Sequence, residues 1–158
     1  NYFMLKIRKT SILLLCIVAI TSCGFKKINM LDAEGFAIQN IKIIGNKRIG
    51  HDLKNDILSY SSKKNENKLE INLEIKKGTV IKERDISSKI TKNTIFVEVI
   101  IMAKKVGEKD FVKKRFVNKL DYDVVRSNSL TLSNEKNSIK QITKLISEDI
   151  TDFLVIYF

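Results

Sequence analysis

Two cysteines, a single histidine and a pair of aspartates are the residues of this 158-residue chain best suited to chemistry. His51 is distant in sequence from Cys16 and Cys23, and the chain has neither a glycine-rich phosphate loop nor a GxSxG motif. Asp121 and Asp123 are two residues apart on an expected strand and share a face, where acidic side chains are most often only solvated. We therefore expect no catalysis, no metal site and no cofactor.

The apolar segment before Cys23 has the features of an export signal. Lys6, Arg8 and Lys9 precede an uncharged block of 16 residues, residues 10–25, and no acidic residue occurs among the first 22. A spanning helix needs about 20 apolar residues, so this block is too short to cross a membrane. Basic residues, a short apolar run and then the small Thr21 and Ser22 follow the order of a secretory signal. The alternative is a hydrophobic segment that contains two cysteines by chance.

The four residues Ile20-Thr21-Ser22-Cys23 resemble the lipobox of bacterial lipoproteins, in which the cysteine is acylated and the chain is cut just before it. The resemblance implies that residues 1–22 are a lipoprotein signal peptide and that Cys23 carries an N-acyl chain and a diacylglycerol. Cys16 is then removed with the signal, so we expect no disulfide. Residues 23–35 would form a lipidated tether, and residues 36–158 a single domain.

The charge balance indicates an anionic partner. The chain has 29 basic and 18 acidic residues, a net charge of +11, and the 26 basic residues outside the signal still leave +8. A basic surface attracts polyanions. Export excludes nucleic acid and favours phospholipid head groups or the phosphates of lipopolysaccharide. For any single lysine, a solvated surface position is an equally good interpretation.

Apolar periodicity predicts the elements that position these side chains. We expect a strand over residues 36–45, a helix over 49–61 and a strand over 68–76, followed by a polar connection over 77–89. A long strand over 94–105 and a turn at Gly107 lead to a last strand within 110–124. A C-terminal helix, capped by Ser133 or Asn134, reaches Tyr157. The first helix is expected to bury a stripe of Ile49, Leu53, Ile57 and Tyr60. The C-terminal helix is expected to bury one broad stripe made of Ile139, Ile142, Leu145, Ile146, Ile150, Phe153, Leu154 and Tyr157. The pattern fits a two-layer α+β sandwich of two helices on a four-stranded mixed sheet, in the order β-α-β-β-β-α.

With these elements placed, the chain resembles the LptE family over nearly all of residues 23–154. The similarity lies in the "CGF" that begins at Cys23 and in the run "KLEINLEIKKG … TIFVEVIIMAKKVGEKDFVKKRFVNKLDYDV". LptE proteins are the lipoprotein half of the outer-membrane complex that inserts lipopolysaccharide. The resemblance implies a non-catalytic domain held by lipid at the periplasmic face of the outer membrane. There it would plug an LptD β-barrel, help it assemble and bind lipopolysaccharide. Gly24 fits this location, because the aspartate that retains lipoproteins at the inner membrane is absent.

The resemblance also suggests where lipopolysaccharide would bind. In the family, basic side chains near the strand ends are implicated, and Lys89 and Lys92 fall near such a position. The densest basic group here is Lys76, Lys77, Lys82, Arg84, Lys89 and Lys92, of which Lys82, Arg84, Lys89 and Lys92 are our candidates. A second basic site of the family meets Ser133 here, with Lys136 nearby. The alternative function is a periplasm-facing lipoprotein of similar fold that binds phospholipid or assists barrel assembly.

Overall fold

The structure is a computed structural model that describes residues 36–62 and 68–158, which form four strands and two helices. In chain order these are β1 (Ala37–Gly45), α2 (Lys47–Ser59), β2 (Lys68–Arg84), β3 (Ile90–Lys105), β4 (Val112–Asp123) and α3 (Asn128–Tyr157). The predicted order β-α-β-β-β-α is confirmed. The predicted signal peptide, Cys23 and the tether lie outside the described residues.

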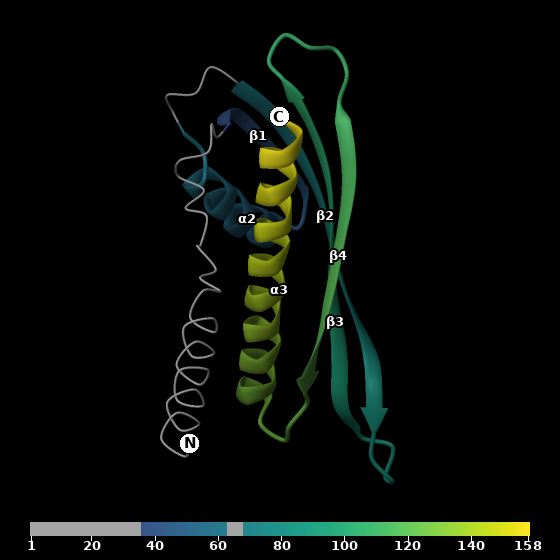
Figure 1. The fold of residues 1–158 in the computed structure, drawn as a ribbon. Helices are drawn as coiled ribbons and strands as arrows, with labels where there is room; N and C mark the ends of the chain where they lie inside the picture. The colour runs from purple at the N-terminus through teal and green to yellow at the C-terminus, as the bar shows by residue number, and fades with distance from the viewer. Residues whose placement is uncertain (1–35, 63–67) are drawn as a thin grey trace, which may run out of the picture.

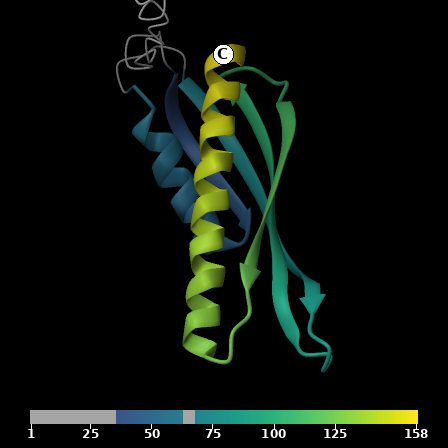
Figure 2. The same ribbon diagram turned by 60° about the horizontal axis from the view of Figure 1, so that its bottom comes forward.

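The four strands form one mixed sheet in the spatial order β1-β2-β3-β4. β1 runs parallel to β2, whereas β2 and β3, and β3 and β4, are antiparallel. Both helices pack against the same face of this sheet, as Figures 1 and 2 show. The molecule is therefore the expected two-layer α+β sandwich, and the other face of the sheet, hereafter the open face, carries no helix among the described residues.

Alternation along β2 and β3 builds the core. The side chains of β2 that face the helices are Leu69, Ile71, Leu73 and Ile75, and those of β3 are Ile95, Val97, Val99, Ile101 and Ala103; all are at most 2% exposed. They pack against Leu53 and Ile57 of α2 and against Ile146, Ile150 and Leu154 of α3. Each such large side chain contributes about 1.5–3 kcal/mol through burial, which is why the alternating pattern specifies the face of each strand.

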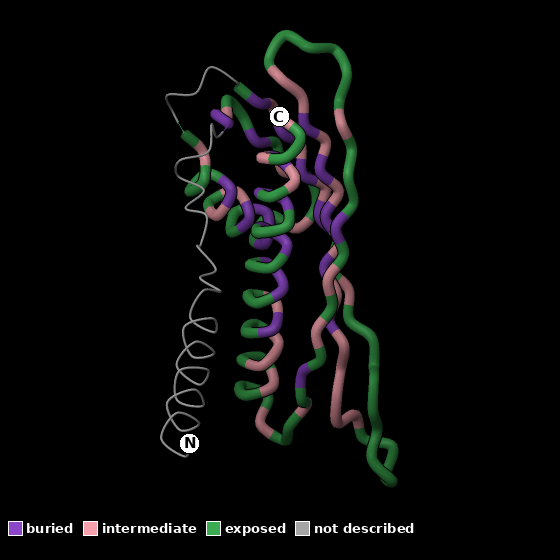
Figure 3. Tube along the Cα trace, viewed as in Figure 1, coloured by how far each residue is buried: buried purple, intermediate pink, exposed green. Residues whose placement is uncertain are grey.

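The polar connection predicted over residues 77–89 is wrong. β2 continues to Arg84 and β3 begins at Ile90, so only residues 85–89 connect them. β2 and β3 stay in register from the pair Lys77–Val97 to the pair Ile81–Asn93. This pairing supplies the backbone hydrogen bonds of the extension. Its β2 residues from Thr79 to Arg84 are exposed on both faces, as the green end of the hairpin in Figure 3 shows. Without a buried face, no apolar alternation signals the strand.

Both helices begin earlier than predicted. α2 begins at Lys47, where the Asn46 side chain accepts a hydrogen bond from Ile49 N at 3.1 Å. α3 begins at Asn128 with Ser127 as its N-cap, not Ser133 or Asn134. The first turns of α3 expose Leu130 and Leu132, so the buried stripe that marks the helix in the sequence starts only further along. Capping side chains, not apolar periodicity, define these starts.

The predicted helical stripes are confirmed where they meet the sheet. Ile49, Leu53 and Ile57 of α2 are buried, but Tyr60 is the C-cap residue and is exposed. On α3, Ile142, Ile146, Ile150 and Leu154 are buried, whereas Leu145 and Tyr157 are exposed. The broad stripe expected from the sequence is thus narrower in the structure, because the sheet covers only the side of α3 that faces it.

Gly45 makes the sharp passage from β1 to α2 possible. Its φ is +94°, and a Cβ at this position would lie 2.1 Å from Ile75 O. The next residue, Asn46, donates its backbone N–H to the same Ile75 O at 3.2 Å. A residue with a side chain would therefore be strained and would also displace the parallel neighbour β2.

Candidate functional site: the end of the β2–β3 hairpin

The candidate cations of the sequence gather at one end of the molecule, in residues 80–94, hereafter the hairpin end. β2 and β3 reach past β4 here, because Lys92 lies opposite Asp123, the last residue of that strand. Four basic residues and two acidic residues occur within the hairpin end. The basic ones are Lys82, Arg84, Lys89 and Lys92.

Asp85 gives the connecting turn a defined shape. Its Oδ1 accepts hydrogen bonds from Ser87 N at 2.8 Å, from Ser87 Oγ at 2.7 Å and from Lys89 N at 3.0 Å. The Ser87 hydroxyl first, and the backbone of Lys89 next, hold the pKa of Asp85 below its ordinary value. Ser88 adopts a φ of +63°, and its carbonyl accepts from Arg84 Nη1 at 2.7 Å. The turn is thus fixed by its own side chains.

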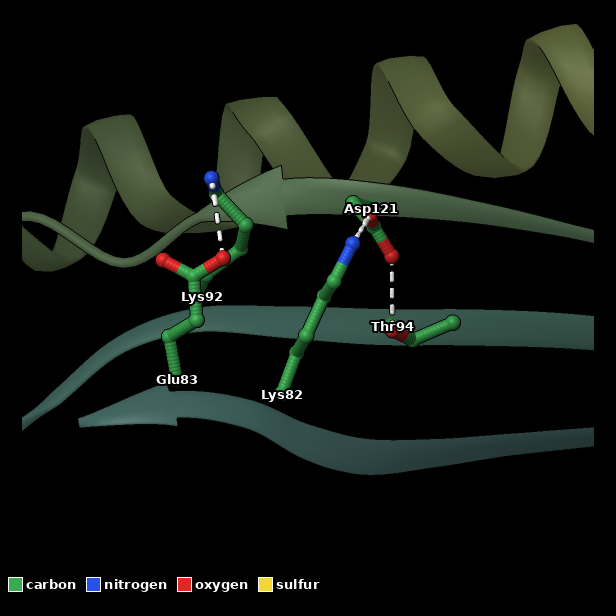
Figure 4. Close-up of polar contacts among 5 residues, drawn as sticks. All are labelled: Lys82, Glu83, Lys92, Thr94 and Asp121. Carbon is green, nitrogen blue, oxygen red and sulfur yellow. Dashed lines mark hydrogen bonds and ion pairs between the residues drawn. The ribbon is translucent and has the colours of Figure 1, made fainter.

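Lys82 and Lys92 lie on the open face and are already paired with acids. The register is irregular between Ile81 and Glu83, so the side chains of the consecutive residues Lys82 and Glu83 lie on the same face of the sheet (Figure 4). Figure 4 shows Lys82 pointing to Asp121 of β4 and Lys92 pointing to Glu83. The Lys92 Nζ to Glu83 Oε1 distance is 3.4 Å. An incoming anion must therefore compete with carboxylates at both lysines.

The Lys82–Asp121 pair is reinforced by Thr94, whose hydroxyl donates to Asp121 Oδ1 at 2.6 Å. The hydrogen bond from Lys82, followed by that from Thr94, lowers the pKa of Asp121, and the same hydrogen bond to Asp121 raises the pKa of Lys82. Both groups thus stay charged over a wider pH range than they would alone. This triad joins three neighbouring strands at the base of the hairpin end.

Arg84 and Lys89 are the cations of the hairpin end that remain open to a ligand. Among the described residues, no acidic side chain forms an ion pair with either. Arg84 uses Nη1 to contact Ser88 O, which leaves further guanidinium N–H groups for an anion. Lys89 contributes only its backbone N–H to the turn. These two side chains are the best placed to bind phosphate.

The remaining basic candidates lie elsewhere. Lys76 pairs with Glu74 at 3.1 Å, further along β2. Lys77 points to the other face of the sheet and pairs with Glu135 of α3 at 3.0 Å. The structure therefore divides the six-residue cluster that the sequence suggested.

Ser133 and Lys136, at the position of the second expected basic site, lie in the first turns of α3. Lys136 lines a groove of about 710 Å³ between α2 and α3. Both basic and acidic side chains line this groove, among them Arg48, Asp52, Lys140 and Glu148. It belongs to the helix side of the molecule, and Lys136 does not join Lys82 and Lys92 on the open face.

Sequence reasoning missed Ile86, which lies in the middle of the turn with its side chain fully exposed. The neighbouring Val80 and Ile81 are 54% and 49% exposed. The signal was present as a single isoleucine within the charged run "KERDISSK". The hairpin end thus combines cations with aliphatic side chains, a composition suited to an amphipathic anion.

The residues first considered for chemistry are separate in the structure. His51 is exposed on α2, whereas Asp121 forms an ion pair with Lys82 and accepts a hydrogen bond from Thr94. Within residues 36–62 and 68–158, no three His, Cys, Asp or Glu side chains come together as metal ligands. In the same part of the chain, neither helix is both long and apolar enough to cross a membrane.

Solved structures of other proteins share the fold of this chain. A structure of Shewanella oneidensis rare lipoprotein B matches with a TM-score of 0.54 and 8% identity, over 70% of this chain and 89% of that one. The fold is shared with bacterial lipoproteins. An uncharacterized lipoprotein B of Nitrosomonas europaea matches with a TM-score of 0.51 and 16% identity, over 82% and 92% of the two chains.

A third match is a Caulobacter crescentus CB15 protein provisionally assigned as a lipoprotein, with a TM-score of 0.53 and 12% identity, over 74% of this chain and 89% of that one. No protein-family model matches the chain, and no curated protein sequence does. At these identities the likeness is one of fold alone.

Proposed function

We propose that this protein is an LptE-like lipoprotein that is anchored by lipid on Cys23 to the periplasmic face of the outer membrane. There it assembles with an LptD-like β-barrel and aids the insertion of lipopolysaccharide. The observation that carries the proposal is the fold shared with lipoproteins, rare lipoprotein B among them, in a chain whose sequence contains a lipobox-like segment. The protein would act by binding and positioning, without a catalytic group or cofactor.

The hairpin end would contact lipopolysaccharide. Arg84 and Lys89 would hold a lipid A phosphate through charge-assisted hydrogen bonds, and Ile86 between them would meet an acyl chain. Lys82 and Lys92 would contribute less than Arg84 and Lys89, because their own charges are shared with Asp121 and Glu83. Single exposed contacts are worth about 1 kcal/mol or less, so binding needs the group as a whole.

Charge removal at the hairpin end tests this contact. We expect the double variant Lys89→Gln and Lys92→Gln to weaken lipopolysaccharide binding roughly tenfold, which corresponds to about 1.4 kcal/mol. The matched control is Lys42→Gln with Lys119→Gln, which removes the same charge from exposed positions of β1 and β4. Binding of the detergent-solubilised full-length chain to immobilised lipopolysaccharide gives the affinity, and circular dichroism checks the fold. Equal losses in both variants would show that only net charge matters.

A pull-down from solubilised envelope tests the anchor and the barrel together. Mass spectrometry of the captured full-length protein should find an acylated Cys23 and a large β-barrel as its partner. An acylated protein without a barrel would favour the alternative, a lipoprotein that binds phospholipid or assists barrel assembly. An intact, unacylated N-terminus would contradict the proposed anchor.

A further inference from the structure

The end of the molecule opposite the hairpin end also presents an unusual surface. Here the first residue of β1, Ala37, lies opposite Lys68, the first residue of β2. Val106, in the turn from β3 to β4, donates its N–H to Lys68 O at 2.8 Å. Figures 1 and 2 place the end of α3 beside this turn. We call this region, formed by Phe36, Lys68, residues 104–114 and residues 156–158, the anchor end.

Apolar side chains of the anchor end are directed into solvent. Val106 and Phe111 in the turn are 42% and 44% exposed, and Ile156 in the last turn of α3 is 85% exposed. The Nζ of Lys104 lies 4.9 Å from the centroid of the Phe111 ring. These side chains sit outside the core and leave apolar area in water, which a bilayer would cover.

Basic side chains surround these apolar residues. Residues 104–114 contain five lysines and two acidic residues. Within the described part of the chain, Lys105 and Lys109 form no ion pair. Aromatic and aliphatic side chains ringed by lysines are the composition of segments that bind at the interface of an anionic bilayer. Each lysine near such a surface strengthens the attraction to anionic lipid.

The path of the chain decides which end would face the membrane. The domain begins at Phe36, whose carbonyl accepts from Ser62 N at the anchor end. From Cys23 to Phe36 the chain spans roughly 45 Å at most when fully extended. If lipid holds Cys23 in a bilayer, the anchor end is therefore the part of the domain that is tethered near the lipid surface, whereas the hairpin end is at the far side of the sheet.

We propose that the anchor end docks on an anionic phospholipid bilayer, with Phe111, Val106 and Ile156 in the headgroup region and with Lys105 and Lys109 on its phosphates. The proposal rests on the lipid anchor of the proposed function but requires neither lipopolysaccharide nor a barrel. Docking fixes the orientation of the domain, with the hairpin end at the end of the sheet opposite the docked residues.

Tryptophan fluorescence tests this orientation directly, because the chain contains no tryptophan. The Phe111→Trp variant reports on the anchor end, and Ile86→Trp, at another exposed turn, is the matched control at the hairpin end. Each full-length variant is reconstituted into vesicles of phosphatidylethanolamine and phosphatidylglycerol, with and without brominated acyl chains. We expect the emission of F111W to shift to shorter wavelength and to be quenched by brominated lipid, and that of I86W to remain as in water.

Two further measurements define the chemistry of docking. Adding Lys105→Gln and Lys109→Gln to F111W should reduce the quenching, as should phosphatidylcholine vesicles or high salt, because all three weaken attraction to anionic lipid. Unquenched F111W, or equal quenching of F111W and I86W, would overturn the proposal.

Mass spectrometry of the same sample shows whether Cys23 is acylated. The test of docking is thereby kept separate from the test of the lipid anchor. Quenching of unacylated F111W by anionic vesicles alone would support docking although the anchor had failed. Unquenched F111W overturns docking whether Cys23 is acylated or not. Because no lipopolysaccharide is present, failure of the hairpin end to bind it leaves this result unaffected.

Discussion

At the residue scale, the partners of each lysine decide its availability. Lys82 and Lys92 come from the same basic run as Arg84 and Lys89, yet the first two are paired with Asp121 and Glu83 and the last two are not. Charge in the sequence therefore overstates the binding capacity of the hairpin end. An anion would meet Arg84 and Lys89 first, and it would gain the other two only by displacing carboxylates.

The Lys82–Asp121 pair predicts a specific pH dependence. The folded pKa of Asp121 is lowered, chiefly by Lys82, so its contribution to stability is present above the unfolded value near 3.8 and is lost as pH falls through the lower folded value. We expect Lys82→Met to raise the pKa of Asp121, as followed by NMR titration of its carboxyl carbon. Glu98, whose pKa is lowered by Arg115, is the internal control and should not move. An unchanged pKa of Asp121 would show that Lys82 is not its main determinant.

At the element scale, α3 illustrates how one helix serves both burial and exposure. Ile146 is fully buried, whereas its neighbour Leu145 is 47% exposed. The buried positions are spaced to meet the sheet, and Ser147 and Thr151 beside them satisfy their hydroxyls on carbonyls of the preceding turn, Lys144 O and Ser147 O. Small polar side chains with satisfied hydroxyls can be buried at little cost.

Neighbouring alanine substitutions on α3 should therefore differ sharply. We expect Ile146→Ala to lower the free energy of unfolding by about 2–5 kcal/mol, because it leaves a cavity against the sheet. Leu145→Ala should change it by about 0.5 kcal/mol, since the site is half in water. Urea denaturation of the two variants gives both values. Similar losses would mean that the buried face of α3 is not the one that the structure shows.

At the scale of the whole molecule, the sheet is longer than its core. Residues 69–75 of β2 are alternately buried under the helices, whereas residues 79–84 are exposed on both faces. The two ends of the sheet therefore differ. The hairpin end is a single layer with a defined turn, whereas the sheet, α3 and the start of the domain meet at the anchor end. An elongated shape of this kind can contact different partners at its two ends.

Hydrogen exchange should reveal this gradient along single strands. Amides of β2 and β3 that pair between Leu69 and Ile75 should exchange only through global unfolding, while those of Val80 to Arg84 and their partners exchange through local opening. Two-dimensional NMR of the protein in deuterated buffer measures the rates. Uniform protection along the whole hairpin would indicate that another surface covers its end.

By itself, the sequence determined the order of the elements and the buried faces of β2, β3, β4 and both helices. The strict alternation from Leu69 to Ile75 and the apolar spacing of Ile142, Ile146 and Ile150 are local records of burial, and burial is what the core demands. The sequence also located the basic residues of the hairpin end. It could not locate the helix starts at Asn46 and Ser127, because single capping side chains carry no period.

Only the tertiary structure decided how long the hairpin is and which cations are free. The exposed half of β2 is held by backbone pairing with β3, which leaves no side-chain pattern to read. Lys82 meets Asp121, 39 residues away, and Lys77 meets Glu135, 58 residues away, on the other face. Such pairs depend on strand register and on the side to which α3 returns. Register and packing side are long-range properties, so no local spacing in the sequence specifies them.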